Sequence, residues 1–96
     1  MGLAKLSDFL KRKRTDAKLT QGQVAEILGY TSPQFVSNWE RGLAYPPIET
    51  LKRLAKIYGI DLNEVYEAFL SASVSDMERD LKEKFFSEKK SRRSSR

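Results

Sequence analysis

The sequence contains no cysteine and no histidine. Disulfide bonds, thiolate–zinc sites and catalysis by cysteine or histidine are therefore excluded for these 96 residues. No run of about 18 apolar residues occurs, so no segment is predicted to span a membrane. A glycine-rich phosphate loop and paired catalytic carboxylates are also missing. We therefore expect a non-enzymatic, cytoplasmic protein without a metal or cofactor.

Charge, by contrast, is abundant and unevenly distributed. The chain has 18 lysines and arginines against 13 acidic residues, a formal net charge of +5. Residues 1–60 contain ten basic and five acidic residues, residues 61–88 three basic and eight acidic, and residues 89–96 five basic and none acidic. The basic first part suits a polyanionic partner, whereas the acidic segment is expected to face away from nucleic acid.

Hydrophobic periodicity predicts an all-α fold without strands. Leu3, Leu6 and Leu10 share one face of a helix over about residues 3–17. Four further helices are predicted over about residues 21–28, 33–41, 48–58 and 62–70. Thr20 is the predicted N-cap of the second helix, and Gly29 is predicted to end it in the C′ position, just after the last helical residue.

The later helix starts also have sequence signals. Ser32 is expected to cap the third helix, with Pro33 in the first helical position. Asp61 and Glu64 predict a capping box for the fifth helix. Its inward face is predicted to comprise Leu62, Val65, Tyr66 and Phe69.

The segment after residue 70 is predicted to be separate from the bundle. Ser71 to Ser75 is expected to interrupt the helical pattern, and residues 89–96 are expected to be disordered. An apolar stripe predicts a sixth helix, and it comprises Val74, Met77, Leu81 and Phe85. This stripe either folds back on the bundle or pairs with another chain, and we favour a second copy. The predicted domains are thus 1–70, 71–88 and 89–96.

The third predicted helix has a polar face. Gln34, Ser37, Asn38 and Arg41 recur at positions i, i+3, i+4 and i+7. Amide side chains pair bidentately with adenine in the major groove, a serine hydroxyl contacts base edges, and a guanidinium binds phosphate. The alternative is an ordinary solvated helix face, which this spacing alone does not exclude.

The order of motifs over residues 6–70 resembles the lambda-repressor-like (Cro/CI, XRE) helix-turn-helix family. The matching segments are Lys13-Arg14, Leu19-Thr20-Gln21, Val24-Ala25, Leu28-Gly29, Val36-Ser37, Trp39-Glu40-Arg41-Gly42, Pro47-Ile48-Glu49-Thr50-Leu51 and Leu54-Ala55. The resemblance implies a five-helix bundle whose second and third helices bind duplex DNA.

The resemblance also implies individual roles. Gln21 would bind a phosphate, and Arg41 and the backbone near Tyr45 would do the same. Base-reading positions correspond to Pro33, Gln34, Ser37 and Asn38. Because proline cannot donate a hydrogen bond, Ser32 or Gln34 would replace the polar reader at Pro33.

Several residues have a structural interpretation beside the functional one. Arg14 and Glu40 match a pair that forms a salt bridge in some family members. Trp39 is predicted to belong to the core. Phe35 either packs under the turn or contacts a thymine methyl group, and we favour packing.

Together these features predict a sequence-specific, nucleoid-associated regulator of transcription, most simply a homodimeric repressor with its third helix in the major groove. One alternative is an antitoxin-type or adaptor protein that binds a protein partner through residues 72–88. Another is nonspecific nucleic-acid binding led by the basic segment 89–96.

Overall fold

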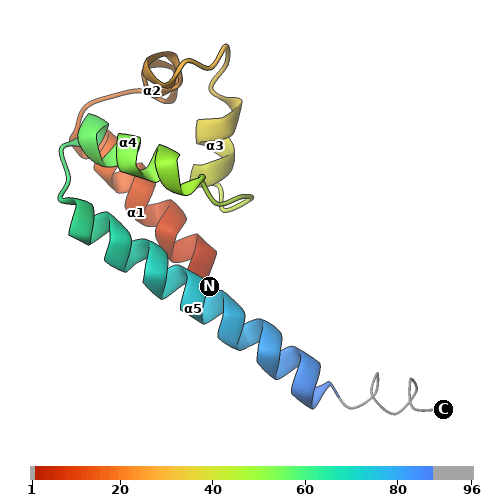
Figure 1. Ribbon diagram of the computed structural model, residues 1–96. Coiled ribbons are helices and arrows are strands. Elements are labelled where there is room, and N and C mark those ends of the chain that lie inside the picture. Colours follow the sequence, from red (N-terminus) through yellow and green to blue (C-terminus); the bar gives the residue numbers. More distant parts are fainter. Residues whose placement is uncertain (1, 88–96) are drawn as a thin grey trace.

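The computed structural model describes residues 2–87 and contains five helices. They are α1 (Gly2–Asp16), α2 (Gln21–Leu28), α3 (Gln34–Glu40), α4 (Ile48–Tyr58) and α5 (Leu62–Phe86). Helices α1 to α4 gather at one end, while α5 runs beside α1 and extends well beyond the bundle (Figure 1). No strand occurs in residues 2–87, which confirms the predicted all-α, lambda-repressor-like bundle.

The core lies where α1 meets the other helices. Leu6 and Leu10 from α1 are 1% and 2% exposed, and they pack with the buried apolar residues of the later helices. The other fully buried large side chains are Val24, Val36 and Leu54. Trp39 is buried in the same cluster, which confirms its prediction as a core residue.

The termini of α2 follow from local sequence. The Thr20 side chain accepts a hydrogen bond from the Gln23 backbone N–H, and the Gln23 side chain accepts one from the Thr20 N–H. This capping box confirms Thr20 as the N-cap. Gly29 ends the helix with φ +92°, a left-handed conformation that glycine adopts without steric cost.

The starts of α3 and α5 differ from the predictions. Pro33 is the N-cap of α3 rather than its first residue, so the expected cap by Ser32 is wrong. The Ser32 hydroxyl accepts a hydrogen bond of 3.4 Å from the Gln34 backbone N–H. Asp61 caps α5 by accepting a hydrogen bond from the Asn63 N–H. The expected capping-box role of Glu64 is wrong, because its carboxylate pairs with Lys13 at 3.1 Å.

The predicted break between residues 71 and 75 is also wrong. α5 continues without interruption from Leu62 to Phe86, so the predicted sixth helix is the second half of α5 and the boundary at residue 70 falls inside it. Serine costs a helix less than about 0.7 kcal/mol per residue. Ala72, in the middle of the serine run, is 1% exposed, and its packing favours continuation of the helix. Residues 89–96, predicted to be disordered, lie outside the described part of the chain.

The inward face of α5 is likewise only partly as predicted. Val65 is buried and Phe69 is half-buried, but Leu62 and Tyr66 are 52% and 55% exposed. Val65 and Ala72 are seven residues apart and share the face that packs on the bundle. Leu62 and Tyr66 therefore point to the side of that face, toward solvent.

Two contacts join the middle of α5 to the rest of the chain. Gly2, at the start of α1, lies directly against the backbone carbonyl of Ala72, leaving no room for a Cβ atom. The hydroxyl of Tyr45, in the α3–α4 loop, donates a hydrogen bond to the Asp76 carboxylate. Both contacts hold α5 where it leaves the bundle.

Candidate nucleic-acid interface

Helices α2 and α3 form a helix-turn-helix unit. Val24, Ala25 and Leu28 anchor α2 in the core. After Gly29 the chain reverses, and the Tyr30 N–H donates a hydrogen bond to the Ala25 carbonyl at 2.9 Å. This hydrogen bond ties the start of the turn to the end of α2.

The two sides of α3 have opposite character. Val36, Trp39 and Glu40 are buried on the inner side. On the outer side, Gln34 and Arg41 are exposed. Ser37 and Asn38 lie between them and are half-buried. The predicted reading residues thus share one accessible face on a helix whose opposite side is fixed in the core.

Gln34 and Asn38 are connected within that face. The Gln34 side-chain amide donates a hydrogen bond to the Asn38 side-chain oxygen at 3.0 Å. The Asn38 amide group therefore remains available as a donor and the Gln34 carbonyl as an acceptor. A donor and an acceptor side by side match the hydrogen-bonding pattern of a base edge in the major groove.

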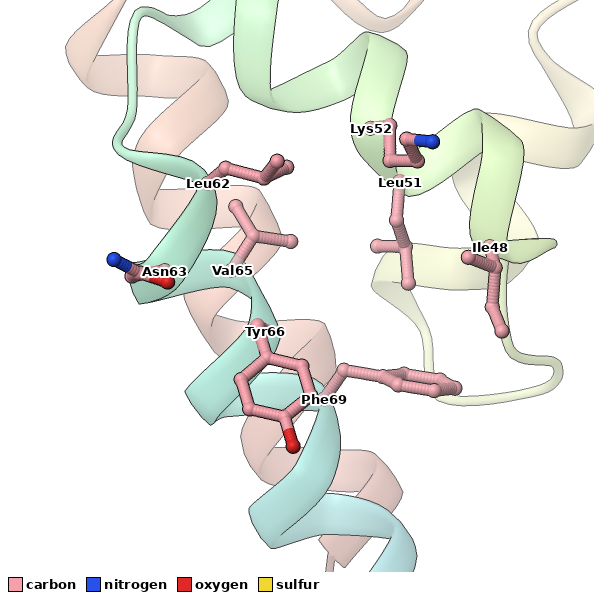
Figure 2. A pocket seen from close by; sticks show the side chains of 8 residues that line it. All are labelled: Ile48, Leu51, Lys52, Leu62, Asn63, Val65, Tyr66 and Phe69. Atoms are coloured by element: carbon pink, nitrogen blue, oxygen red, sulfur yellow. The ribbon is translucent and has the colours of Figure 1, made fainter.

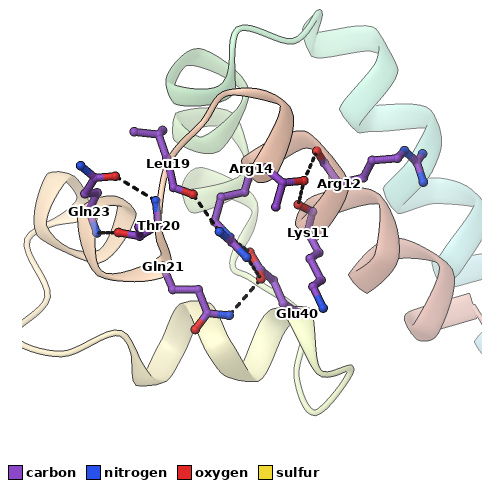
Figure 3. Close-up of polar contacts among 9 residues, drawn as sticks. Lys11, Arg12, Arg14, Leu19, Thr20, Gln21, Gln23 and Glu40 are labelled. Carbon is purple, nitrogen blue, oxygen red and sulfur yellow. Dashed lines mark hydrogen bonds and ion pairs between the residues drawn. The ribbon is translucent and has the colours of Figure 1, made fainter.

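An internal ion pair holds α1 and α3 together (Figure 3). The Arg14 guanidinium contacts both oxygens of Glu40, at 2.7 and 3.0 Å, and donates a third hydrogen bond to the Leu19 carbonyl at 2.7 Å. Its hydrogen bond to Glu40 raises the pKa of Arg14. The two side chains are only 11% and 4% exposed. The structure therefore brings the predicted pair together in a bidentate, largely buried arrangement.

Gln21, an expected phosphate contact, belongs to the same network. Its side-chain amide donates a hydrogen bond to Glu40 at 3.0 Å, which ties the start of α2 to α3 (Figure 3). No acidic residue lies in the first turn of α2. Because helix N-termini favour anions, the backbone at Gln21 and Gly22 remains suited to a phosphate.

The Tyr45 side chain points away from α3. Its ring packs edge-on against Phe69, with ring centres 5.5 Å apart, and its hydroxyl is bonded to Asp76. Burial and, secondarily, the Asp76 hydrogen bond raise the pKa of Tyr45 to about 12. A phosphate contact at this position would thus come from the backbone, as the resemblance implies.

The entrance to α3 carries exposed side chains. Ser32, Pro33 and Phe35 are all exposed, and Phe35 retains 53% of its surface. The Phe35 ring packs on Tyr30, with ring centres 4.9 Å apart. Packing under the turn, the favoured interpretation, is therefore present, and about half of the side chain remains exposed.

Two contacts were missed in the sequence. Lys13 of α1 pairs with Glu64 of α5 at 3.1 Å. Arg53 of α4 donates hydrogen bonds to the Ile27 and Leu28 carbonyls at the end of α2, at 3.1 and 3.4 Å. Each basic residue is far along the chain from the group that it contacts. The sequence alone therefore did not predict either contact.

The predicted partner-binding stripe on α5 is accessible. The exposed fractions of Val74, Met77, Leu81 and Phe85 are 49%, 57%, 47% and 74%.

Within residues 2–87, no group of acidic residues is placed to hold a metal ion. The helices of the same part of the chain include none both long and apolar enough to cross a membrane.

Three known proteins are similar to part of this chain. The HTH-type transcriptional activator BcrR of Enterococcus faecalis is 39% identical over 59 residues, covering 62% of this chain and 28% of that protein. Multiprotein-bridging factor 1a of Arabidopsis thaliana is 37% identical over 57 residues, covering 59% of this chain and 39% of that protein. The cryptic phage CTXphi transcriptional repressor RstR of Vibrio cholerae is 31% identical over 78 residues, covering 81% and 62%.

The chain thus spans less than two thirds of the length of each of these relatives. No solved structure gives a significant match. A family model described as helix-turn-helix matches residues 10–65, which include α2, α3 and α4 completely. The chain therefore belongs to the lambda-repressor-like (Cro/CI, XRE) helix-turn-helix family of DNA-binding transcriptional regulators.

Proposed function

We propose that the protein is a sequence-specific transcriptional repressor that binds duplex DNA as a homodimer. The observation that carries this proposal is the accessible polar face of α3, fixed from behind by Val36 and Trp39. Gln34 and Asn38 contact base edges, with Ser37 beside them. Arg41 and the start of α2 at Gln21 contact phosphates on either side.

The charge distribution supports this orientation. Residues 1–60, which include the helix-turn-helix unit, have a net charge of +5 and are attracted to the phosphate backbone. Residues 61–88 have a net charge of −5 and begin immediately before α5. α5 is therefore directed away from the duplex and is free to bind another protein chain.

The decisive experiment is selection of bound duplexes from a random pool, followed by affinity measurements on the selected sequence. Gln34→Ala combined with Asn38→Ala is expected to weaken binding of that sequence by about 1–3 kcal/mol, the value of a bidentate base contact. Binding to an unrelated duplex should change much less, because phosphate contacts carry no sequence information.

The control is Ser71→Ala, which alters an exposed polar residue of α5 far along the chain from α3. It should leave both affinities unchanged. A double variant that binds the selected duplex normally, together with loss of binding when residues 89–96 are removed, would contradict the proposal. That result would support nonspecific binding by the basic segment.

A second candidate function is an adaptor whose main partner is a protein. The exposed stripe on the second half of α5 favours it, as does the similarity to a protein named multiprotein-bridging factor. Sedimentation at micromolar concentration distinguishes the two. A monomer that selects no DNA sequence supports the adaptor, whereas a dimer that selects two half-sites supports the repressor.

A further inference from the structure

The loop between α3 and α4 has an accessible tip. It comprises residues 41–47, between the last residue of α3 and the first residue of α4. Gly42 turns the chain away from α3 with φ +75°, and the Leu43 N–H donates a hydrogen bond to the Asn38 carbonyl at 2.9 Å. Leu43 is 60% exposed and Ala44 is also exposed, so the tip of the loop is open to a ligand.

This tip carries two backbone donors in succession. Within residues 2–87, the N–H groups of Ala44 and Tyr45 have no hydrogen-bond acceptor. The next two residues are Pro46 and Pro47, which have no N–H group. Ala44 and Tyr45 are therefore the last donors of the loop before α4. Backbone N–H groups are among the donors that bind DNA phosphates.

The end of the loop is anchored to α5. Pro46 is buried, and Tyr45 is half-buried with its ring against Phe69 and its hydroxyl bonded to the Asp76 carboxylate. Figure 2 shows the Phe69 ring extending from α5 toward Ile48, the first residue of α4. The Tyr45 side chain is thus held at two positions of α5 that are seven residues, or about 10 Å, apart.

The Asp76 carboxylate is itself held in place. Its side chain is 19% exposed, and the Arg79 guanidinium approaches it at 3.4 Å from one turn further along α5. One turn before Asp76, Ala72 packs directly against Gly2 of α1, which fixes this part of α5 on the bundle. The acceptor of the Tyr45 hydrogen bond therefore belongs to the fixed part of α5 and not to its projecting end.

We propose that Asp76 is a positioning residue for DNA binding. By accepting the hydrogen bond from the Tyr45 hydroxyl, it fixes the α3–α4 loop so that the Ala44 and Tyr45 N–H groups donate hydrogen bonds to one phosphate of the duplex. The inference rests on the proposed DNA-binding function. It adds to that function a residue of α5 that lies outside the helix-turn-helix unit and beyond the matched residues 10–65.

The physical reason is the cost of ordering a loop on binding. A backbone segment that becomes fixed only in the complex loses conformational freedom at that step, and the affinity falls accordingly. With Tyr45 held by α5, the two N–H groups are fixed before the duplex arrives. Loss of the anchor should therefore weaken binding to every duplex, while the base contacts of α3 remain.

Affinity measurements on the selected duplex test this role. Tyr45→Phe and Asp76→Ala each remove the hydrogen bond, and Tyr45→Phe keeps the ring that packs on Phe69. Each change is expected to weaken binding by about three- to tenfold, less than the full value of a hydrogen bond to a charged group, because the loop can still reach the phosphate. An unrelated duplex should lose affinity by the same factor, since phosphate contacts carry no sequence information.

Two further variants show whether the effect comes from this hydrogen bond. The double variant Tyr45→Phe with Asp76→Ala should bind no more weakly than either single variant, because both changes remove one interaction. Asp76→Asn keeps an oxygen that accepts from the tyrosine hydroxyl, and it should bind within about twofold of the wild type.

The matched control is Tyr66→Phe, which removes the hydroxyl of a tyrosine on α5 that is 55% exposed. It should bind both duplexes like the wild type. Circular dichroism at the temperature of the binding assay establishes that every variant contains the same amount of helix.

Methylphosphonate scanning separates positioning from a general loss of stability. A single methylphosphonate, in which a methyl group replaces one charged phosphate oxygen, is placed at each position of the selected duplex in turn. Binding of the wild type should weaken at the phosphates contacted by the loop, by Arg41 and by the start of α2. In Tyr45→Phe the effect should shrink at the phosphate of the loop and persist at the others. A change in stability alone would leave all of these effects as they are in the wild type.

The outcomes distinguish this inference from the proposed function. A wild-type protein that selects no duplex would overturn both. If the wild type selects a duplex and Tyr45→Phe and Asp76→Ala bind it equally tightly, only the positioning role of Asp76 is overturned. The same conclusion follows if both variants bind more weakly but show the wild-type response to every methylphosphonate.

Discussion

The bundle and the second half of α5 differ in how far their apolar side chains are buried. In the bundle, the large apolar side chains of α1, α2 and α3 are covered by the chain's own helices. In residues 74–86, every large apolar side chain is at least 47% exposed, and the helix is supported by pairs such as Lys82–Glu78 at 3.6 Å. The bundle therefore covers its own apolar surface, whereas the projecting helix leaves apolar surface that this chain does not cover.

The largest expected effect comes from removing half of the ion pair inside the bundle. Glu40→Ala leaves the Arg14 guanidinium largely buried without its partner and also removes the acceptor of Gln21. We expect the free energy of unfolding to fall by about 3–5 kcal/mol, measured by denaturant titration. The loss should be the same at all protein concentrations, because the contact lies within one chain.

The corresponding change in the projecting helix is Leu81→Ser. It should leave the stability of dilute protein nearly unchanged and abolish the rise of the melting temperature with concentration that a dimer shows. Equal, concentration-independent losses from Glu40→Ala and Leu81→Ser would remove the distinction between the two regions.

A smaller effect is expected at the contact where the two regions meet. Gly2→Ala adds a Cβ atom against the Ala72 carbonyl and forces α1 away from α5. The expected cost is about 1–3 kcal/mol, as for other overpacked contacts. Gly22→Ala is the matched control, because its Cβ would lie 3.9 Å from the nearest atom and the helix gains about 0.5–1 kcal/mol from losing a glycine. Similar losses for both variants would show that the Gly2 contact is not specific.

The smallest effect concerns pH. The Tyr45 hydrogen bond, above all, lowers the pKa of Asp76 in the folded chain. This contribution to stability is therefore fully present above the unfolded value of about 3.9 and is lost as the pH falls through the folded pKa. Tyr45→Phe should flatten this part of the stability profile below about pH 4, measured by denaturant titration. Identical acid profiles for the two proteins would contradict the role of the hydrogen bond.

The sequence predicted the bundle well because its signals are local. The capping threonine at position 20 and the left-handed glycine at position 29 each act within a few residues. The pairing of Arg14 with Glu40 was predicted only through the family resemblance, since 26 residues separate them. The contact of Tyr45 with Asp76 spans 31 residues, and Asp76 lies beyond the matched segment, so nothing in the sequence indicated this contact.

The course of α5 was predicted least well. The serines from 71 to 75 favour turns as isolated residues, but Ala72 packs on the start of α1 and the helix continues. That contact depends on the tertiary structure. Because a break was predicted between residues 71 and 75, the apolar residues of this one helix were assigned to two separate helices. Those before residue 70 were predicted to face inward, and those after it to form a separate stripe.

Because α5 is unbroken, its two ends have a fixed angular relation. Inserting one residue near position 73 would rotate Leu81 by about 100° relative to Leu62 and shift it by about 1.5 Å. An insertion of seven residues would change the angle by only about 20°. Whether an insertion or deletion in the middle of this helix is tolerated should therefore depend on the rotation it introduces between the two ends, rather than on the number of residues.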